Sequence, residues 1–264
     1  MLIIGDRIDA TRKYIAQAVL TENRGFIQSE VMDQAVSGAD YINLNAAIFG
    51  EDEEKRLHWM IEAVQEVTDI PLCIDSPNPA IIEKALSLVK KRPMINAITL
   101  EAGRMDPLLR LVIEHGVKVI ASCQAQNSTA ETTEDKVAIA GRLIRMVTDA
   151  GVPADDLYID PLAYSLSTNA QAARATLRAI EQIMMKFSGV HTTCCLRTIS
   201  YGLPARNLLH RTFLAAAMER GLDSAIIDPT DSKLYAVVVA GRLISGREEC
   251  CLNYIRAFRE GRLE

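Results

Sequence analysis

The chain alternates short apolar runs with amphipathic segments along almost its whole length. Eight runs are rich in β-branched and other apolar residues, and we expect each to form a strand: 2–4, 41–44, 72–74, 95–98, 117–121, 157–159, 192–196 and 224–227. Continuous apolar runs of this length are typical of parallel strands covered on both faces. Helical spacing of apolar residues marks the segments between and after them, at 27–37, 52–67, 79–90, 107–115, 134–150, 170–187, 205–220, 233–243 and 248–259.

A strand and a helix repeated eight times is the pattern of a (β/α)₈ TIM barrel, an α/β fold. The length of 264 residues fits one such domain over 1–264. Glycine follows four of the expected helices, as it does where a left-handed residue ends a helix: Gly38, Gly116, Gly151 and Gly221. The alternative is a doubly wound open sheet, which usually carries G-x-G-x-x-G after its first strand. Here that strand runs into Gly5-Asp6-Arg7-Ile8-Asp9 instead, which favours the barrel.

Composition excludes several broad classes of protein. Hydrophobic residues make up 49% and charged residues 24%, as in soluble globular proteins. The net charge of -5 comes without a block of like charge, so we expect no binding to nucleic acid or anionic membrane. The sequence shows no signal peptide and no membrane-spanning run, which predicts a cytoplasmic protein. Six cysteines without metal-binding spacing are expected to be reduced, mostly buried thiols.

Polar residues gather where the expected strands end, which is where (β/α)₈ barrels carry their catalytic groups. In strand order these residues are Asp6, Arg7 and Asp9; Asn43 and Asn45; Asp75 and Asn78; Asn96 and Glu101; Gln124, Gln126 and Asn127; Asp160; Arg197, Thr198 and Ser200; Asp228 and Asp231. Because the strand ends converge on one mouth, repulsion among the carboxylates must be relieved by a donor-rich ligand, a metal ion or arginine.

The residue types at the mouth argue against two kinds of ligand. The four histidines fall in or beside expected helices, so we expect no metal site: His58, His115, His191 and His210. The acidic segment 228–231 has the wrong sign for phosphate. A neutral heterocycle with N–H donors and ring acceptors remains. Aspartate accepts paired N–H bonds and asparagine offers one donor and one acceptor, so Asp75, Asn96 and Asp160 are predicted to bind such a ring.

Each of these residues also has a purely structural interpretation. Asp75 and Asp160 could cap the helices that follow their strands. Asn96 could satisfy nearby backbone groups. We expect Arg7 to pair with a neighbouring strand-end carboxylate rather than to contact a substrate.

The chain resembles the pterin-binding family that includes methyltetrahydrofolate:corrinoid methyltransferases and, more distantly, dihydropteroate synthase. The matching stretches span nearly the whole chain: Ile3-Ile4-Gly5-Asp6-Arg7-Ile8, residues 38–45, Pro71-Leu72-Cys73-Ile74-Asp75-Ser76, Asn96-Ala97-Ile98, Tyr158-Ile159-Asp160-Pro161, Ser200-Tyr201-Gly202-Leu203-Pro204 and residues 221–229. The resemblance implies that the pterin ring contacts Asp75, Asn96 and Asp160, together with Asp6, Asn43 and Ser200.

The resemblance also implies the reaction. A methyl group would move between N5 of tetrahydrofolate, or of 5-methyltetrahydrofolate in the opposite direction, and the cobalt of a corrinoid such as methylcobalamin. In this family the corrinoid usually resides on a separate protein, so we expect a corrinoid protein to dock transiently at the barrel mouth. A homodimer is expected by family analogy alone.

The sequence departs from the family pattern at the seventh strand. The family usually has Ser-Asn, an apolar residue and Ser there, with the asparagine reaching N5, whereas this chain has Arg197-Thr198-Ile199-Ser200. Asn43 also replaces a more usual aspartate, and Asp6 and Asp9 stand where glutamate and asparagine are commoner. We expect Thr198 to take over the N5 contact, through a bridging water or with Arg197.

Two alternatives to this methyltransferase follow from the departures. The lost asparagine is compatible with a non-catalytic tetrahydrofolate-binding protein. A dihydropteroate synthase-like enzyme is less favoured, because that branch carries Arg-x-His near its C-terminus and this chain has Arg256-Ala257-Phe258-Arg259.

Overall fold

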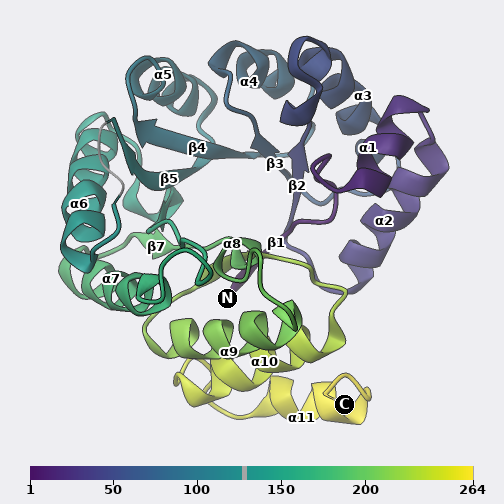
Figure 1. Ribbon diagram of the computed structural model, residues 1–264. Helices are drawn as coiled ribbons and strands as arrows, with labels where there is room; N and C mark the ends of the chain where they lie inside the picture. Colours follow the sequence, from purple (N-terminus) through teal and green to yellow (C-terminus); the bar gives the residue numbers. More distant parts are fainter. Residues whose placement is uncertain (127–129, 264) are drawn as a thin grey trace.

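A computed structural model describes residues 1–126 and 130–263, so Asn127 lies outside the described residues. Eight parallel strands form one sheet in the order β7-β6-β5-β4-β3-β2-β1-β8, and helices surround it (Figure 1). The strands are β1 (Leu2–Gly5), β2 (Tyr41–Asn45), β3 (Leu72–Asp75), β4 (Met94–Leu100), β5 (Lys118–Ala125), β6 (Leu157–Asp160), β7 (His191–Thr192) and β8 (Ser224–Ile227). The predicted (β/α)₈ barrel is confirmed.

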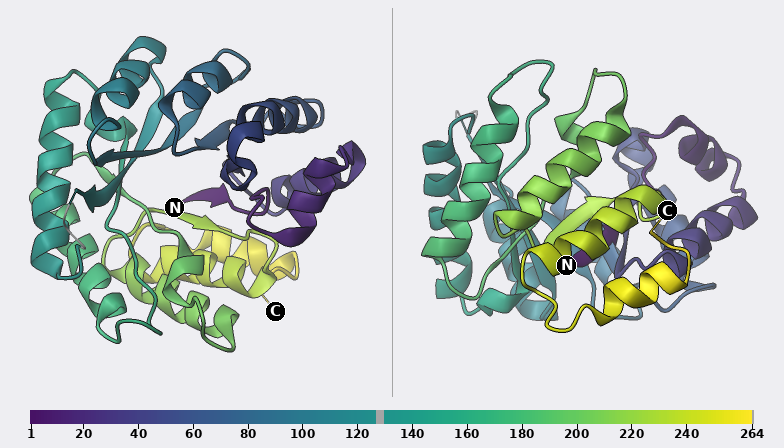
Figure 2. Two further views of the ribbon diagram at one scale, coloured as in Figure 1. Left: turned by 45° about the horizontal axis from the view of Figure 1, so that its top comes forward. Right: turned by 90° about the horizontal axis from the view of Figure 1, so that it is seen from below.

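The helices follow the strands as expected, with two additions. They are α1 (Lys13–Leu20), α2 (Arg24–Val36), α3 (Glu53–Gln65), α4 (Pro79–Leu86), α5 (Met105–His115), α6 (Thr133–Asp149), α7 (Ala172–Lys186), α8 (Leu196–Ile199), α9 (Arg206–Glu219), α10 (Ser232–Ile244) and α11 (Leu252–Arg259), with short 3₁₀ helices η1 (Ala47–Asp52) and η2 (Ala154–Asp156). Helices α1 and α8 were not expected from the sequence pattern. Near the C-terminus α10 packs against both α9 and α11 (Figure 2).

Side chains on both faces of the sheet are buried, as the continuous apolar runs predicted. Inside the barrel, one layer takes a residue from seven of the strands: Ile4, Tyr41, Cys73, Met94, Ile120, Tyr158 and Ile226. Outside it, the strands pack against the apolar faces of the helices. The interior layer is a packed floor beneath the carboxyl ends of the strands.

The structure also bears on the helix-ending glycines, the cysteines and the predicted absence of membrane-spanning segments. The four helix-ending glycines have positive φ, of 93°, 58°, 95° and 113° in chain order. All six cysteines are free thiols, and most are buried or half-buried as expected, whereas Cys250 and Cys251 are exposed. No helix in the described part of the chain is long and apolar enough to cross a membrane.

The seam between β7 and β8 differs from the expected strand at 192–196. The paired part of β7 ends at Thr192, and beyond it a single bridge joins Cys195 to Ile226. The Ile226 N–H donates to the Cys194 carbonyl at 2.9 Å. Because α8 already begins at Leu196, the residues expected at the end of this strand lie on a short helix instead.

Side chains strengthen this weak seam at the amino ends of its strands. Asp223, just before β8, accepts a hydrogen bond from the Thr192 N–H at 2.9 Å, and its other oxygen lies 2.6 Å from His191 Nδ1. Nε2 of the same imidazole lies 3.1 Å from Asp155, and its ring stacks on Tyr158 at 4.7 Å. The hydrogen bond to Asp223 raises the pKa of His191, although burial opposes the charged form. The imidazole thus links two acidic residues across the seam, and both of them favour its charged form.

Replacing this histidine should therefore destabilise the barrel in a pH-dependent way. We expect His191→Gln to lower the free energy of unfolding by about 1–2 kcal/mol below pH 6.5. Because the folded-state pKa is raised, the contribution of the charged ring is complete below that pH and is lost as pH rises through the folded-state value. Urea unfolding at pH 6 and pH 9 measures the difference. His58→Gln, at an exposed site on α3, is the control, and an equal loss at both pH values would contradict the prediction.

Candidate functional site

Three neighbouring strands bring amide and carboxylate groups together at the barrel mouth. The sheet register pairs Asp75 with Asn45 on one side and with Asn96 on the other. Asn43 donates from Nδ2 to Asp75 Oδ2 at 3.3 Å, while its own Oδ1 is buried without a hydrogen-bond partner in the described part of the chain. Burial raises the pKa of Asp75, and hydrogen bonds from Asn45 and Asn43 oppose the rise. The site therefore combines a shielded carboxylate with an unused amide acceptor.

Asp160 contributes a second carboxylate from the end of β6. It pairs in register with Ser122 on β5, and its Oδ1 accepts a hydrogen bond from the Leu162 N–H at 2.8 Å. Burial raises the pKa of Asp160 to about 6, although the Leu162 N–H and the nearby Lys136 ammonium both lower it. Only Oδ1 is hydrogen-bonded within the described part of the chain, which leaves Oδ2 for a ligand.

The local geometry excludes the helix-capping interpretation of both aspartates. Helix α4 is capped by Asn78, whose side chain accepts from the Ala80 N–H at 3.0 Å, and not by Asp75. Helix α7 begins at Ala172, far along the chain from Asp160, whose bond to Leu162 closes a turn instead. The Asn96 amide makes no hydrogen bond within residues 1–126 and 130–263, so nothing described there uses it to satisfy the backbone.

Arg7 behaves as the sequence predicted. Its Nη1 lies 3.2 Å from Asp228 Oδ2, and its Nη2 lies 2.5 Å from Glu30 on α2. The side chain ties the ends of β1 and β8 to a helix, which is a structural role.

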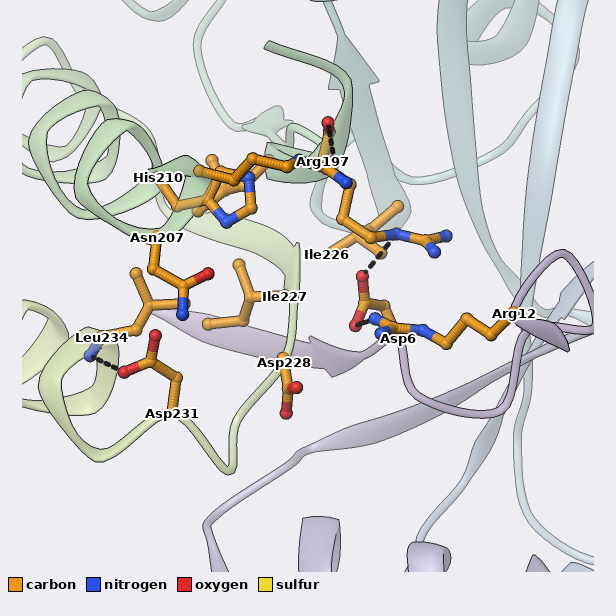
Figure 3. Close-up of a pocket in the computed structure, with 12 residues that line it drawn as sticks. Asp6, Arg12, Arg197, Asn207, His210, Ile226, Ile227, Asp228, Asp231 and Leu234 are labelled. Carbon is orange, nitrogen blue, oxygen red and sulfur yellow. Dashed lines mark hydrogen bonds and ion pairs between the residues drawn. The ribbon is translucent and has the colours of Figure 1, made fainter. Parts of the chain in front are cut away.

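Arg197 occupies the side of the mouth formed by β1 and α8. Its Nε lies 2.8 Å from Asp6, it forms a second ion pair with Asp9, and Arg12 approaches the other Asp6 oxygen at 2.9 Å (Figure 3). Burial disfavours the charged form of Arg197, but the carboxylates of Asp6 and Asp9 outweigh it and raise the pKa. Burial also raises the pKa of Asp6, which the two arginines oppose. Both oxygens of Asp6 thus face arginines, and its predicted contact with the pterin stays a prediction.

A pocket of about 160 Å³ opens next to this cluster, between α8, α9, β8 and α10 (Figure 3). Its polar lining includes Asp6, Arg197, Arg206, Asn207, His210 and Asp228. Asp75, Asn96 and Asp160 do not line it. The mouth therefore has two adjoining parts, one with the carboxylate and amide groups of β2 to β6 and one with the arginine-rich pocket.

Ser200 and Thr198, both predicted to face the substrate, have different surroundings. Ser200 is completely buried, with its hydroxyl 2.7 Å from His210 Nε2 and accepting from Arg206 Nε at 3.0 Å. The structure thus joins Ser200 to α9 rather than to the carboxylates of β3 and β6. Thr198 is exposed on α8, and its hydroxyl makes no hydrogen bond in the part of the chain that is described.

Two basic residues of the site were not predicted from the sequence. Arg12 precedes α1, a helix that the apolar pattern did not reveal. Lys136 lies on α6 and is completely buried, donating to the backbone carbonyls of Pro161 and Leu162. Its position gave a usable signal, because helical spacing places it on the apolar face of α6 with Val137 and Ala140.

The described residues contain no group of three or more His, Cys, Asp or Glu side chains arranged to hold a metal ion. The polar groups of the mouth instead offer hydrogen-bond acceptors and paired charges. Such a set can recognise a flat ring that carries several N–H donors.

Comparison with known proteins identifies the family. The model of the family described as pterin binding enzyme matches residues 16–228, and the chain belongs to this family. A methylcorrinoid:tetrahydrofolate methyltransferase from Eubacterium limosum is 31% identical over 265 residues, which cover 100% of this chain and 98% of the relative. Methionine synthase from Mycobacterium tuberculosis is 30% identical over 240 residues, which cover 86% of this chain but only 20% of that much longer protein.

Solved structures with the same fold include dihydropteroate synthases. The enzyme from Thermus thermophilus superposes with a TM-score of 0.67 at 20% identity, covering 90% of this chain and 93% of the other. The enzyme from Xanthomonas albilineans with 4-aminobenzoic acid gives a TM-score of 0.69 at 20% identity, covering 94% and 93%. At such low identity the likeness concerns the fold alone.

Proposed function

We propose that this protein is a methyltransferase that moves a methyl group between the cobalt of a corrinoid and N5 of tetrahydrofolate, with residues 1–264 acting as one pterin-binding unit. The observation that carries the proposal is the set of acceptors at the ends of β2 to β6, centred on Asp75, Asn96 and Asp160. The relative from Eubacterium limosum supports the reaction type, and its name favours transfer from the corrinoid to the folate.

The residues at the mouth fit a pterin by their chemistry. The amino-pyrimidinone edge of a pterin presents several N–H donors, and aspartates accept such bonds in pairs. Oδ2 of Asp160 and the buried Oδ1 of Asn43 both lack a donor within the described residues. A bound pterin would supply donors to both oxygens, and Asn43 Oδ1 is otherwise a buried acceptor left unpaired at a cost in free energy.

The two aspartates make this assignment testable by affinity. We expect Asp75→Asn and Asp160→Asn each to weaken tetrahydrofolate binding by about 1–3 kcal/mol, because each loses a charged acceptor. Wild-type affinity should also fall as the pH drops below about 6, where Asp160 becomes protonated, and this dependence should disappear in Asp160→Asn. Anaerobic titration calorimetry measures both effects. Asp155→Asn, with 82% of its side chain exposed, is the control, and affinities unchanged in the two mouth variants would refute the assignment.

Transfer to the folate requires the protein to hold three atoms in line and to allow N5 to lose its proton. The N5–carbon bond forms as the carbon–cobalt bond of the corrinoid substrate breaks and leaves its electron pair on cobalt, and N5 gives up its proton. Fixing N5, the methyl carbon and cobalt in line removes much of the entropic barrier. A hydrogen bond to N5 accelerates the step only if it is stronger in the transition state.

Thr198 is the better placed of the two candidate groups for that hydrogen bond. The Arg197 guanidinium is already paired with Asp6 and Asp9, whereas the Thr198 hydroxyl has no protein partner within the described residues. A hydroxyl both donates and accepts, so it can serve either direction of transfer. Because threonine is shorter than the asparagine usual in this family, we propose that a water bridges it to N5.

Removing the hydroxyl should slow methyl transfer more than it weakens binding. We expect Thr198→Ala to reduce the single-turnover rate roughly 10-fold, the value of about one hydrogen bond, with little change in tetrahydrofolate affinity. Thr198→Asn, which places an amide there, should retain activity. Thr212→Ala is the matched control, since that hydroxyl bonds only to Leu208 of its own helix at 2.9 Å within the described residues. A Thr198→Ala rate equal to wild type in both directions would exclude Thr198 from the N5 contact.

One assay separates the proposal from its alternatives. Mixing the protein anaerobically with methylcobalamin and tetrahydrofolate should produce 5-methyltetrahydrofolate, with a matching change in the corrinoid spectrum, and the reverse mixture should approach the same equilibrium. Tight folate binding without methyl transfer would instead support a non-catalytic folate-binding protein. Turnover with a pterin pyrophosphate and 4-aminobenzoate would support the synthase alternative.

The finer assignments extend the proposal by family analogy. A separate corrinoid protein would dock at the barrel mouth, where N5 must meet the cobalt. A homodimer and a cytoplasmic location complete the proposed setting.

A further inference from the structure

Lys136 is a buried cation that the proposed chemistry does not use. Lys136 is 0% exposed, and its Nζ donates to the Pro161 carbonyl at 2.7 Å and to the Leu162 carbonyl at 2.5 Å. The ammonium also lies 4.9 Å from the centroid of the Tyr164 ring. No carboxylate within the described residues comes close enough to form an ion pair with it. Burying an ammonium costs several kcal/mol unless its surroundings compensate. The burial of Lys136 therefore indicates that its charge has a role in the protein.

The ammonium holds the turn that follows β6. Within this turn Asp160 accepts from the Leu162 N–H, and Leu162 adopts a left-handed φ of 55°, which is uncommon for a residue with a side chain. The carbonyls of Pro161 and Leu162 both accept hydrogen bonds from Nζ of Lys136. Removing the ammonium would leave two carbonyls without this donor, directly beside Asp160.

The charges around Lys136 single out Asp160 as the group it influences. Burial lowers the pKa of Lys136, and Asp160 is the strongest of the groups that oppose this, ahead of Cys123 on β5, Cys194 and Glu131. The two thiols stay neutral, because burial raises the pKa of each. Glu131 is exposed, so solvent screens its charge. Asp160 is therefore the strongest charge acting on Lys136, and Lys136 in turn lowers the pKa of Asp160, after the Leu162 N–H.

We propose that Lys136 is a positioning residue for pterin recognition, fixing the turn at 160–162 and keeping the Asp160 carboxylate ionised for the ligand's N–H donors. The inference rests on the proposed function only in assigning Asp160 to the pterin. The link between Lys136 and Asp160 is a property of the ligand-free protein and can be measured there.

Lys136→Gln separates charge from hydrogen bonding, because the amide can still donate to the turn but carries no charge. In ligand-free protein, the carboxyl ¹³C signal of Asp160 should titrate roughly one pH unit higher in this variant than in wild type. Tetrahydrofolate affinity at pH 6.5 should fall several-fold and recover toward wild type at pH 8.5. Lys136→Arg should keep the wild-type titration, and Lys84→Met, at an exposed lysine on α4, should change nothing.

Three outcomes would overturn the inference. An unshifted Asp160 titration in Lys136→Gln refutes the charge coupling. A loss of folate affinity that is equal at all pH values shows a merely structural lysine. A shifted titration with folate affinity unchanged in both Lys136→Gln and Asp160→Asn removes Asp160 from the pterin site, and so counts against the proposed function as well. If Lys136→Gln does not fold, the Asp160 titration in Lys136→Met, which also lacks the charge, decides between the same outcomes.

Discussion

The concentration of buried and half-buried carboxylates at one end of the barrel is the constraint on which the site depends. Parallel strands end together, so Asp6, Asp75 and Asp160 are forced into a common mouth, and burial raises the pKa of each. Different groups stabilise the ionised form of each carboxylate against this burial. They are Arg12 and Arg197 at Asp6, neighbouring asparagine amides at Asp75, and a backbone N–H and a buried lysine at Asp160. The kind of group that stabilises each carboxylate decides whether that carboxylate remains available to a ligand.

Because their partners differ, the carboxylates have different roles at the barrel mouth. At Asp6, ion pairs with Arg197 and Arg12 hold α8 against the end of β1 and shape a pocket wall. Where amides and backbone groups give partial relief, as at Asp75 and Asp160, acceptor capacity remains for a ring rich in N–H donors.

The closure of the barrel is equally important, because an open seam would not hold these strand ends in register. The interior layer of one residue from each of seven strands provides a rigid floor. The weakest contact is between β7 and β8, where one backbone bridge is assisted by Asp223 and His191. The short β7 is followed closely by α8, which carries Arg197, paired with Asp6 and Asp9, and the exposed Thr198.

The sequence by itself determined the eight-fold alternation, the parallel sheet and the carboxylates and amides at the strand ends, because periodicity and strand termini are local properties. It also anticipated the pairing of Arg7 with a strand-end carboxylate. Only the tertiary structure decided that β7 is short, that Arg197 joins Asp6 and Asp9, and that Lys136 reaches the turn after Asp160. These features depend on contacts between residues far apart in the chain, and the closing of the barrel, not local pattern, sets which of them meet.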